Sequence, residues 1–334
     1  MASVFQHPQR RCFGRAPLFD PEAGIPVIEP PGSGPGWWAG AASALYDDET
    51  HRFYLYYRLR RPRSEAVPDR GYVCRIATSA DGQHFETIWQ ATKSDLNTAS
   101  MEKGCLLKTE EGLWRLYLSR VDPEDRRWRT DVLEADAPDG FDVNRLHRVF
   151  TAADVGEEGV KDPYVFTVGR LYYALFSYAT RVPVAAELEA AKHATADIFN
   201  TGLTKSSTAL ATSSDGRHFT WHGEVFAPRP GGWDSYAARI GSLLWTPPVF
   251  TAFYDGSASV AENYEERTGL AITFDLRHYQ RVTTAGPALT SPHASGSLRY
   301  LEALVVDGVI HYYYEYARPD GSHELRLNRV PLEG

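Results

Sequence analysis

The chain has 334 residues, a formal net charge of −8 and an isoelectric point near 5.8. This acidic balance offers no basic surface to a phosphate backbone, so we expect no nucleic-acid partner. Hydrophobic residues make up 43% and aromatic residues 13% of the chain, which is typical of a globular protein. No apolar run approaches the roughly 18 residues of a membrane span, and the start lacks the apolar stretch of a signal peptide. The sequence therefore predicts a cytoplasmic protein without a membrane span.

Five segments rich in Tyr, Leu and Phe recur along the chain, and each has the alternation of a half-buried β-strand. In chain order they are FYLYYR from Phe53, LWRLYLS from Leu113, RLYYALFS from Arg170, VFTAFYD from Val249 and VIHYYYEY from Val309. An apolar segment precedes each of them and a third strand-like segment follows. The pattern predicts an all-β fold built from a repeated unit.

A recurring turn gives the length of this unit. ATSADGQHF begins at Ala77 and ATSSDGRHF at Ala211, twice 67 residues apart, with a degenerate copy, ADAPDGFD, from Ala135. A related turn, TFDLRHY, begins at Thr273. Asp and Gly supply the turn geometry in these segments. Units of about 60 to 70 residues with several strands each are typical of propeller blades.

We predict a single five-bladed β-propeller over residues 1–334, with blades over residues 37–95, 100–150, 159–228, 233–285 and 296–331. The last unit has three clear strands, so we expect the N-terminal segment around residues 10–20 to supply its outer strand. A pair of β-sandwiches is the alternative fold.

One helix is predicted over residues 183–199, as an insertion in the third unit. Pro183 lies in its first turn, and Val184, Leu188 and Ala191 have helical spacing. The insertion either walls a site, makes a subunit contact or decorates the surface.

In a propeller the first strand of every blade lines the central axis, so residues at the starts of these strands converge. The carboxylates there are Asp162, Glu102 and Glu302, and an acidic loop over residues 253–269 adds Asp255 and Glu262. Two carboxylates on either side of a sugar are the minimum equipment for glycoside hydrolysis, since one protonates the leaving oxygen and the other activates water or attacks carbon. These five are the candidate catalytic residues, and a solvated acidic loop is the alternative for the last two.

Basic and aromatic residues near the same strand starts are candidate substrate ligands. Arginine can hold hydroxyls or a carboxylate, and aromatic faces can stack on a sugar ring. The candidate substrate-binding residues are Trp37, Trp38, Lys161, Tyr164, Tyr236, Arg239, Arg299 and Tyr300.

The run DPYVF from Asp162, the following G-x-L-Y-Y and the S-x-D-G-x-x-F turns resemble the five-bladed propeller glycoside hydrolases, the superfamily of families 43, 62, 32, 68, 117 and 130. The resemblance covers the blade plan over nearly the whole chain, but only Asp162 and Pro163 resemble a catalytic motif closely. In family 43 the corresponding aspartate orients the site and adjusts the pKa of the acid, so the resemblance implies that role for Asp162. The resemblance alone also allows a structural calcium or sodium ion.

The chain departs from this family pattern in the first unit. The families place an aspartate, the general base or nucleophile, at the start of the first inner strand, where this chain reads GWWAGAASALYDD with no carboxylate before Asp47. The general acid of the families is a glutamate on a later blade, whereas Glu102 precedes Asp162. These departures imply an incomplete or rearranged hydrolase site.

Cofactor motifs are absent from the sequence. The cysteines Cys12, Cys74 and Cys105 are widely spaced, and the 11 histidines show no HExxH spacing. Neither a P-loop nor a GxGxxG motif occurs. We expect no disulfide, no metal site and no cofactor.

Three functions are compatible with these residues. The first is a glycoside hydrolase-like enzyme acting on a small soluble glycoside by carboxylate acid/base catalysis in the central channel. The second is a repurposed propeller enzyme that rearranges, cyclises or eliminates, which the missing first-unit aspartate motivates. The third is a non-catalytic sugar-binding propeller, which the differences between the strand starts disfavour. The expected partner is a small-molecule glycoside or related metabolite, and the sequence makes no prediction of oligomeric state.

Overall fold

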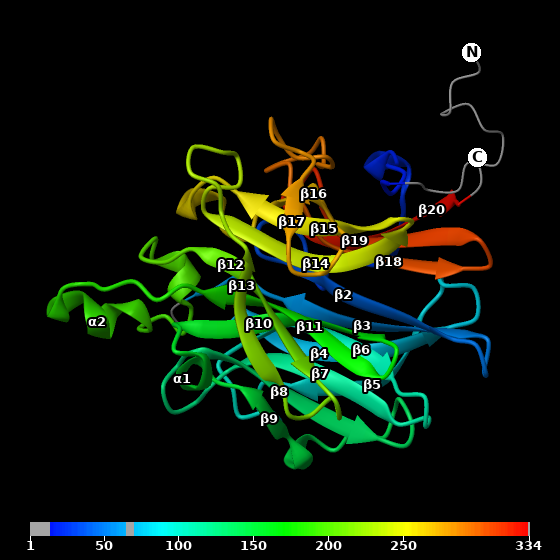
Figure 1. Cartoon of the computed structure of the whole chain (residues 1–334), viewed down its shortest axis with the longest axis horizontal. Coiled ribbons are helices and arrows are strands. Elements are labelled where there is room, and N and C mark those ends of the chain that lie inside the picture. The colour runs from blue at the N-terminus through cyan, green and yellow to red at the C-terminus, as the bar shows by residue number, and fades with distance from the viewer. Residues whose placement is uncertain (1–13, 65–69, 333–334) are drawn as a thin grey trace.

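The computed structural model describes residues 14–64 and 70–332. In these ranges the strands form five groups of four, and the strands within each group pair in antiparallel order (Figure 1). The first group is β2 (Trp38–Asp47), β3 (Arg52–Arg60), β4 (Gly71–Ser79) and β5 (Glu86–Thr92). The second is β6 (Met101–Lys108), β7 (Trp114–Val121), β8 (Trp128–Ala135) and β9 (His147–Phe150).

The remaining groups follow the same plan. The third is β10 (Gly159–Val168), β11 (Leu171–Ala179), β12 (Ser206–Ser213) and β13 (Thr220–Phe226). The fourth is β14 (Ala237–Thr246), β15 (Val249–Ser257), β16 (Arg267–Thr273) and β17 (Tyr279–Arg281). The fifth is β18 (Leu298–Val306), β19 (Val309–Ala317), β20 (His323–Pro331) and, from the start of the chain, β1 (Ile25–Ile28). The strand-forming segments predicted from Phe53, Leu113, Arg170, Val249 and Val309 are confirmed as β3, β7, β11, β15 and β19.

The first strands of the five groups form a closed cycle of neighbours. β2 contacts β6, β6 contacts β10, β10 contacts β14, β14 contacts β18, and β18 contacts β2. Because each group radiates from this cycle, the architecture is propeller-like and all-β, and the predicted fold class is confirmed to that extent.

The strand that completes the fifth group differs from the prediction. β1 pairs with β20, and it lies after the segment of residues 10–20 that was expected to do so. Residues 10–13 lie outside the described residues, and residues 14–19 form no strand. Instead, Phe19 stacks on Tyr312 at 4.7 Å between ring centres, and the Tyr312 hydroxyl donates to the carbonyl of Pro17 at 2.9 Å. Pro17 and the following Pro21 lack backbone donors, so this part of the chain packs through side chains and enters the sheet only at Ile25.

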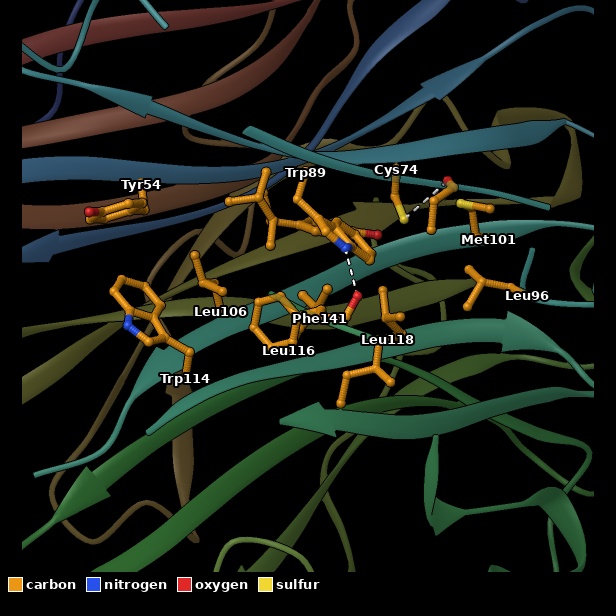
Figure 2. Packing of buried hydrophobic residues seen from close by; sticks show 14 residues of the cluster. Tyr54, Cys74, Trp89, Leu96, Met101, Leu106, Trp114, Leu116, Leu118 and Phe141 are labelled. Carbon is orange, nitrogen blue, oxygen red and sulfur yellow. Dashed lines mark hydrogen bonds between the residues drawn. The ribbon is translucent and has the colours of Figure 1, made fainter. Parts of the chain in front are cut away.

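Hydrophobic side chains fill the space between neighbouring groups. Figure 2 shows the cluster between the first and second groups, where Tyr54 packs against Trp114 with 4.7 Å between ring centres. The Trp89 indole donates to the carbonyl of Phe141 at 2.9 Å in the same cluster. Similar clusters lie between the other neighbouring groups, so the core is a series of wedges around the cycle of first strands.

The recurring turn has one mechanism in three groups. The Asp81 carboxylate accepts from the backbone N–H groups of Gln83 and His84, each at 2.9 Å, and it also contacts the His84 ring. Asp215 and Asp275 do the same with the residues that follow them. Aspartate is favoured at these positions because its side chain satisfies turn N–H groups that no strand can pair.

Helices are few and short in the described ranges. They are η1 (Pro21–Ala23), η2 (Val143–Arg145), α1 (Ala152–Val155), α2 (Ala186–Lys192), η3 (Ile198–Asn200) and η4 (Val260–Glu262). None of those helices is long and apolar enough to span a membrane.

The predicted helix over residues 183–199 is too long. α2 ends at Lys192, and Leu188, which was expected on a packed face, is 44% exposed. α2 projects from one side of the molecule (Figure 1). Lys192 and His193 end the helix on the Glu158 carboxylate, at 2.9 and 3.0 Å, and the chain then turns inward. Helical spacing continues in the sequence, but these polar anchors end the helix.

Candidate functional site

All five first strands have a register shift near their start. The shifts lie after Gly40 in β2, Met101 in β6, Lys161 in β10, Ile240 in β14 and Arg299 in β18. Three residues at these shifts, Ala41, Asp162 and Tyr300, have positive φ angles of 58°, 52° and 49°. Such backbone is strained by about 1 kcal/mol or more for a residue with a side chain, and such strain often accompanies functional sites. The shifts re-aim the side chains at the starts of the inner strands.

Buried charges gather around these strand starts, and we call them the central charge cluster. Every member is at most 4% exposed. The cations are Arg58, Arg60, Arg70, Lys161, Arg239 and Arg299, and the carboxylates are Glu102, Asp162, Asp197, Asp255, Glu266 and Glu315. Burying a charge this deeply costs free energy unless an opposite charge lies beside it, so the partners of each member indicate what that member can do.

One chain of ion pairs runs through Arg299. Its guanidinium contacts Glu315 at 2.7 Å and Glu266 at 2.8 Å, and Glu266 also contacts Arg239 at 2.5 Å. Burial raises the pKa of Glu266, but the two arginines outweigh burial and bring it to about 2. Glu266 is therefore a fixed counter-ion and not a proton donor.

A second set of pairs surrounds Glu102. Its carboxylate contacts Arg58 at 2.8 Å, and Lys161 and Arg60 add positive potential. Burial raises the pKa of Glu102, but these cations more than offset that effect and hold the pKa well below the usual range. Glu102 stays ionised at neutral pH, which suits a counter-ion or a base and not an acid.

Asp255 behaves differently from the other carboxylates. Burial raises its pKa to about 7 although Arg239 opposes the shift. Its Oδ1 accepts the backbone N–H of Tyr300 at 3.0 Å. Asp255 can therefore carry a proton at neutral pH, as a general acid must.

Tyr300 connects Asp255 to Asp162. Its backbone binds Asp255, and its hydroxyl donates to Oδ2 of Asp162 at 3.4 Å. The same Oδ2 contacts Lys161 at 2.7 Å, whereas Oδ1 of Asp162 is buried and has no hydrogen-bond partner among the described residues. Tyr300 therefore lies between Asp255, whose carboxyl group can be protonated, and Asp162, whose Oδ1 is an unused acceptor.

Glu315 places a carboxylate near the start of β2, the first strand of the first unit, which has no carboxylate of its own there. A Cβ atom at Gly40 would overlap the Glu315 carboxylate, which reaches from β19 into the start of β2. Glu315 is held there by Arg299 and by His323, whose Nδ1 lies 3.1 Å from Oε1. A neighbouring group therefore supplies negative charge where the first strand has none.

Models of protein families and searches of curated proteins give no match to this chain. Solved structures do match. A glycosyl hydrolase from Bacteroides ovatus aligns with a TM-score of 0.66 at 14% identity, over 98% of this chain and 99% of the other. The β-1,2-mannobiose phosphorylase from Listeria innocua aligns with a TM-score of 0.59 at 15% identity, over 98% and 95%. A thermostable family-43 glycoside hydrolase aligns with a TM-score of 0.62 at 13% identity, over 87% and 89%.

The chain has the fold of the β-propeller glycoside hydrolases. The propeller-like, all-β fold that the sequence resemblance implied is confirmed, and at these identities the alignments are evidence of the fold alone. The fold does not determine the reaction, which depends on the residues of the site itself.

The propeller brings most of the predicted site residues into the central charge cluster. Asp162, Glu102, Asp255, Lys161, Arg239 and Arg299 are members. Trp38 and Tyr300 contact members through their rings, with Arg60 3.8 Å from the Trp38 ring centre and Arg299 4.7 Å from that of Tyr300. Tyr236 lies beside the cluster, and its hydroxyl donates to the carbonyl of Phe199 at 2.7 Å.

Four predicted residues have other surroundings in the described part of the propeller. Glu302 pairs with Lys103 at 3.0 Å, further along the inner strands, because the register shift of β18 separates it from Arg299. The Tyr164 hydroxyl donates to the carbonyl of Leu243 at 3.3 Å. Glu262 is partly exposed and accepts the backbone N–H of Ala258 at 2.7 Å, which makes it a loop residue. Trp37 is half-buried, and its backbone carbonyl accepts from His323 at 3.0 Å.

The acidic loop nevertheless contributes to the cluster through residues other than Glu262. Glu266 is fully buried between Arg239 and Arg299, and Tyr264 lies against Arg60 and Arg70. The Glu262 carboxylate lies instead in the turn at Ala258, whose backbone N–H it accepts, and its predicted catalytic role stays a prediction.

Several members of the central charge cluster were missed by sequence reasoning. Arg58, Arg60 and Glu315 lie on second strands, and Asp197 lies in the insertion after α2. Asp197 contacts Arg70 and the Tyr264 hydroxyl, and it accepts from the Trp128 indole at 3.0 Å. The insertion therefore supplies a wall of the site. The available signal was a charged residue inside an apolar strand, as in FYLYYRLR and HYYYEY.

Surface hollows of about 290, 610, 650 and 440 Å³ occur on the described part of the molecule, and no member of the central charge cluster lines any of these four. The described residues contain no group of three His, Cys, Asp or Glu side chains that could hold a metal ion.

Proposed function

We propose that the protein is a glycoside-processing enzyme whose reaction takes place in the central charge cluster. The five strand groups are then the blades of one five-bladed propeller, and the substrate is a small soluble glycoside. Structural neighbours named as glycoside hydrolases and as a mannobiose phosphorylase support this class of chemistry.

The single observation that carries the proposal is the pairing of Asp255 and Asp162 across Tyr300. Asp255, with a pKa raised by burial to about 7, is the proton donor to the leaving oxygen. Asp162, through its unused Oδ1, accepts a proton from the attacking water or other nucleophile. Burial favours both the proton donation and the proton acceptance, because electrostatic stabilisation is larger in surroundings of low dielectric constant.

The other members of the cluster hold this pair in place. Lys161 and the Tyr300 hydroxyl fix Oδ2 of Asp162, at 2.7 and 3.4 Å. The Trp38 ring stacks on His323 with 4.1 Å between ring centres and lies 3.8 Å from the Arg60 guanidinium, so it holds Arg60 in place. Asp162 is thus assigned a proton-accepting role, and not only the orienting role that the resemblance implied.

A non-hydrolytic reaction is the second candidate, and one observation favours it. The Glu315 carboxylate lies beside Gly40 at the start of β2, where the first unit has no carboxylate of its own, and it is fully engaged with Arg299, His323 and, at 3.5 Å, Arg58. Fewer free carboxylates remain for activating water than in a complete hydrolase site. An acceptor other than water, or an elimination, would use the same acid.

The test is turnover on a panel of glycosides, with and without inorganic phosphate. We expect Asp255→Asn and Asp162→Asn each to lower kcat about 10²- to 10⁴-fold without unfolding the protein. Glu302→Gln is the matched control, because it changes a buried carboxylate outside the cluster. Full activity in both cluster variants, or no turnover of any glycoside by the parent protein, would overturn the proposal.

A further inference from the structure

Arg60 is a buried cation that forms no ion pair with any residue in the described ranges 14–64 and 70–332. Its side chain is 4% exposed, and neither Nε nor Nη1 has a hydrogen-bond partner among the described residues. The guanidinium lies against two aromatic rings, 3.8 Å from the Trp38 ring centre and 4.5 Å from the Tyr264 ring centre. Ring faces attract a cation but do not satisfy its N–H donors.

The groups around Arg60 do not provide the missing charge. Its nearest charged neighbours include the cations Arg70, Arg58 and Arg299. Glu102, the carboxylate that raises the pKa of Arg60, is paired with Arg58 at 2.8 Å. Burial lowers the pKa of Arg60, and Arg70 lowers it by more than Glu102 raises it, so the pKa of Arg60 falls to about 9.

Two other arginines present unused donors in the same region. Nε and Nη1 of Arg58 and of Arg70 are buried and have no hydrogen-bond partner in residues 14–64 and 70–332. Arg70 also lies 4.3 Å from the centre of the Tyr264 ring that Arg60 contacts, so the two guanidinium groups flank one side chain. Three arginines therefore offer donors that a single anionic group could use.

The balance of charge indicates a monoanion. Six cations face six carboxylates in the central charge cluster, but Asp255 is largely neutral below pH 7. The described residues of the cluster then have one positive charge in excess. A carboxylate would cancel this excess, whereas a phosphate dianion would exceed it.

We propose that the substrate carries an anionic group, the carboxylate of an acidic sugar, and that Arg60 binds it with Arg70 and Arg58. This inference rests on the proposed function, because it names the class of glycoside that the site accepts. The planar guanidinium of Arg60 pairs with the planar carboxylate while Trp38 and Tyr264 cover it. Neutral sugars leave the three arginines unsatisfied and bind weakly.

The experiment measures binding to the full chain, independently of turnover. Calorimetry at fixed ionic strength compares glucuronate with glucose, galacturonate with galactose, and inorganic phosphate and sulfate. We expect each acidic sugar to bind at least about tenfold more tightly than its neutral counterpart. We expect Arg60→Gln to abolish this preference. The matched control is Arg326→Gln, since Arg326 also lies on a tyrosine ring, 4.1 Å from the centre of Tyr316, but outside the cluster.

A second readout does not need a ligand. Because an unpaired buried charge destabilises the empty protein, Arg60→Gln is expected to raise the melting temperature, whereas the loss of a merely structural side chain would lower it. Arg60→Lys keeps the charge but loses the planar guanidinium group. It should weaken binding of the acidic sugars without raising the melting temperature.

Four outcomes overturn the inference. Equal binding of acidic and neutral sugars, or an unchanged preference in Arg60→Gln, removes the carboxylate site. Binding of inorganic phosphate without binding of either acidic sugar assigns the arginines to a phosphate co-substrate instead. Turnover of neutral glycosides that depends on Asp255 would contradict this inference alone, whereas binding of acidic sugars without turnover of any glycoside would contradict the proposed function alone.

Discussion

Asp255 should set the pH dependence of the reaction. An acid must be protonated to act, and burial raises the pKa of Asp255 from its ordinary value to about 7. The active form is therefore present below pH 7 and is lost as the pH rises through about 7, with kcat/KM falling about tenfold per unit above it. A pH profile of kcat/KM checks this prediction. The residual activity of Asp255→Asn should not fall above pH 7. A fall that persists in this variant would assign the pH dependence to another group.

A single glycine shows how tightly the site is packed. Gly40→Ala would place a methyl group in the space of the Glu315 carboxylate and disturb its pair with Arg299. We expect a loss of about 1–3 kcal/mol in the free energy of unfolding, measured with urea. Gly241→Ala is the matched control in another first strand, because a Cβ atom there meets nothing within 4 Å. Equal losses in both variants would mean that Glu315 moves aside at no cost.

At the scale of elements, the insertion after β11 is held by polar contacts. Glu158 accepts from Lys192 at 2.9 Å and contacts His193 at 3.0 Å, and these contacts end α2 where the chain turns toward Asp197. The insertion carries Asp197 to Arg70, so its anchoring and the geometry of the site are coupled.

Glu158→Gln should loosen this insertion. The neutral side chain loses the ion pairs with Lys192 and, at 3.3 Å, with Arg127, and we expect faster hydrogen exchange over residues 186–200, equivalent to about 1–3 kcal/mol of local stability. Glu189→Gln is the control, since Glu189 also contacts Lys192 at 2.9 Å but is half exposed. Unchanged exchange in Glu158→Gln would indicate that apolar contacts of Ile198 and Phe199 hold the segment without it.

At the scale of the whole molecule, closure of the ring depends on a strand from the start of the chain. β1 pairs with β20, so the first and last parts of the sequence form one group. The Tyr314 hydroxyl on β19 donates to the carbonyl of Pro21 at 2.8 Å, which ties the approach to β1 onto the same group.

Removal of residues 1–28 should lower the melting temperature by several degrees or more. The deletion exposes the edge of β20 and the apolar side chains under β1, both of which favour unfolding and aggregation. Thermal unfolding followed by circular dichroism measures the effect. Tyr314→Phe keeps the strand and loses one hydrogen bond, so its loss should be only about 1 kcal/mol. A deletion no worse than Tyr314→Phe would show that closure does not need β1.

The sequence by itself determined the class of fold, the five repeated units and the positions of the second strands. These features follow from local alternation of apolar and polar residues and from turns that Asp81 and Asp215 build with their own neighbours. The start of the third inner strand was also readable, and it led to Asp162 and Lys161 in the site.

Only the tertiary structure decided which charges meet. Asp197, Glu315 and Arg60 come from an insertion and from second strands, and their positions depend on the register shifts and on closure of the ring. The tertiary structure also decided that the strand completing the fifth group begins at Ile25 and not at an earlier residue. Pairing across such long separations leaves little trace in local sequence pattern, because the partner of each buried charge is selected by the packed fold and not by its neighbours in the chain.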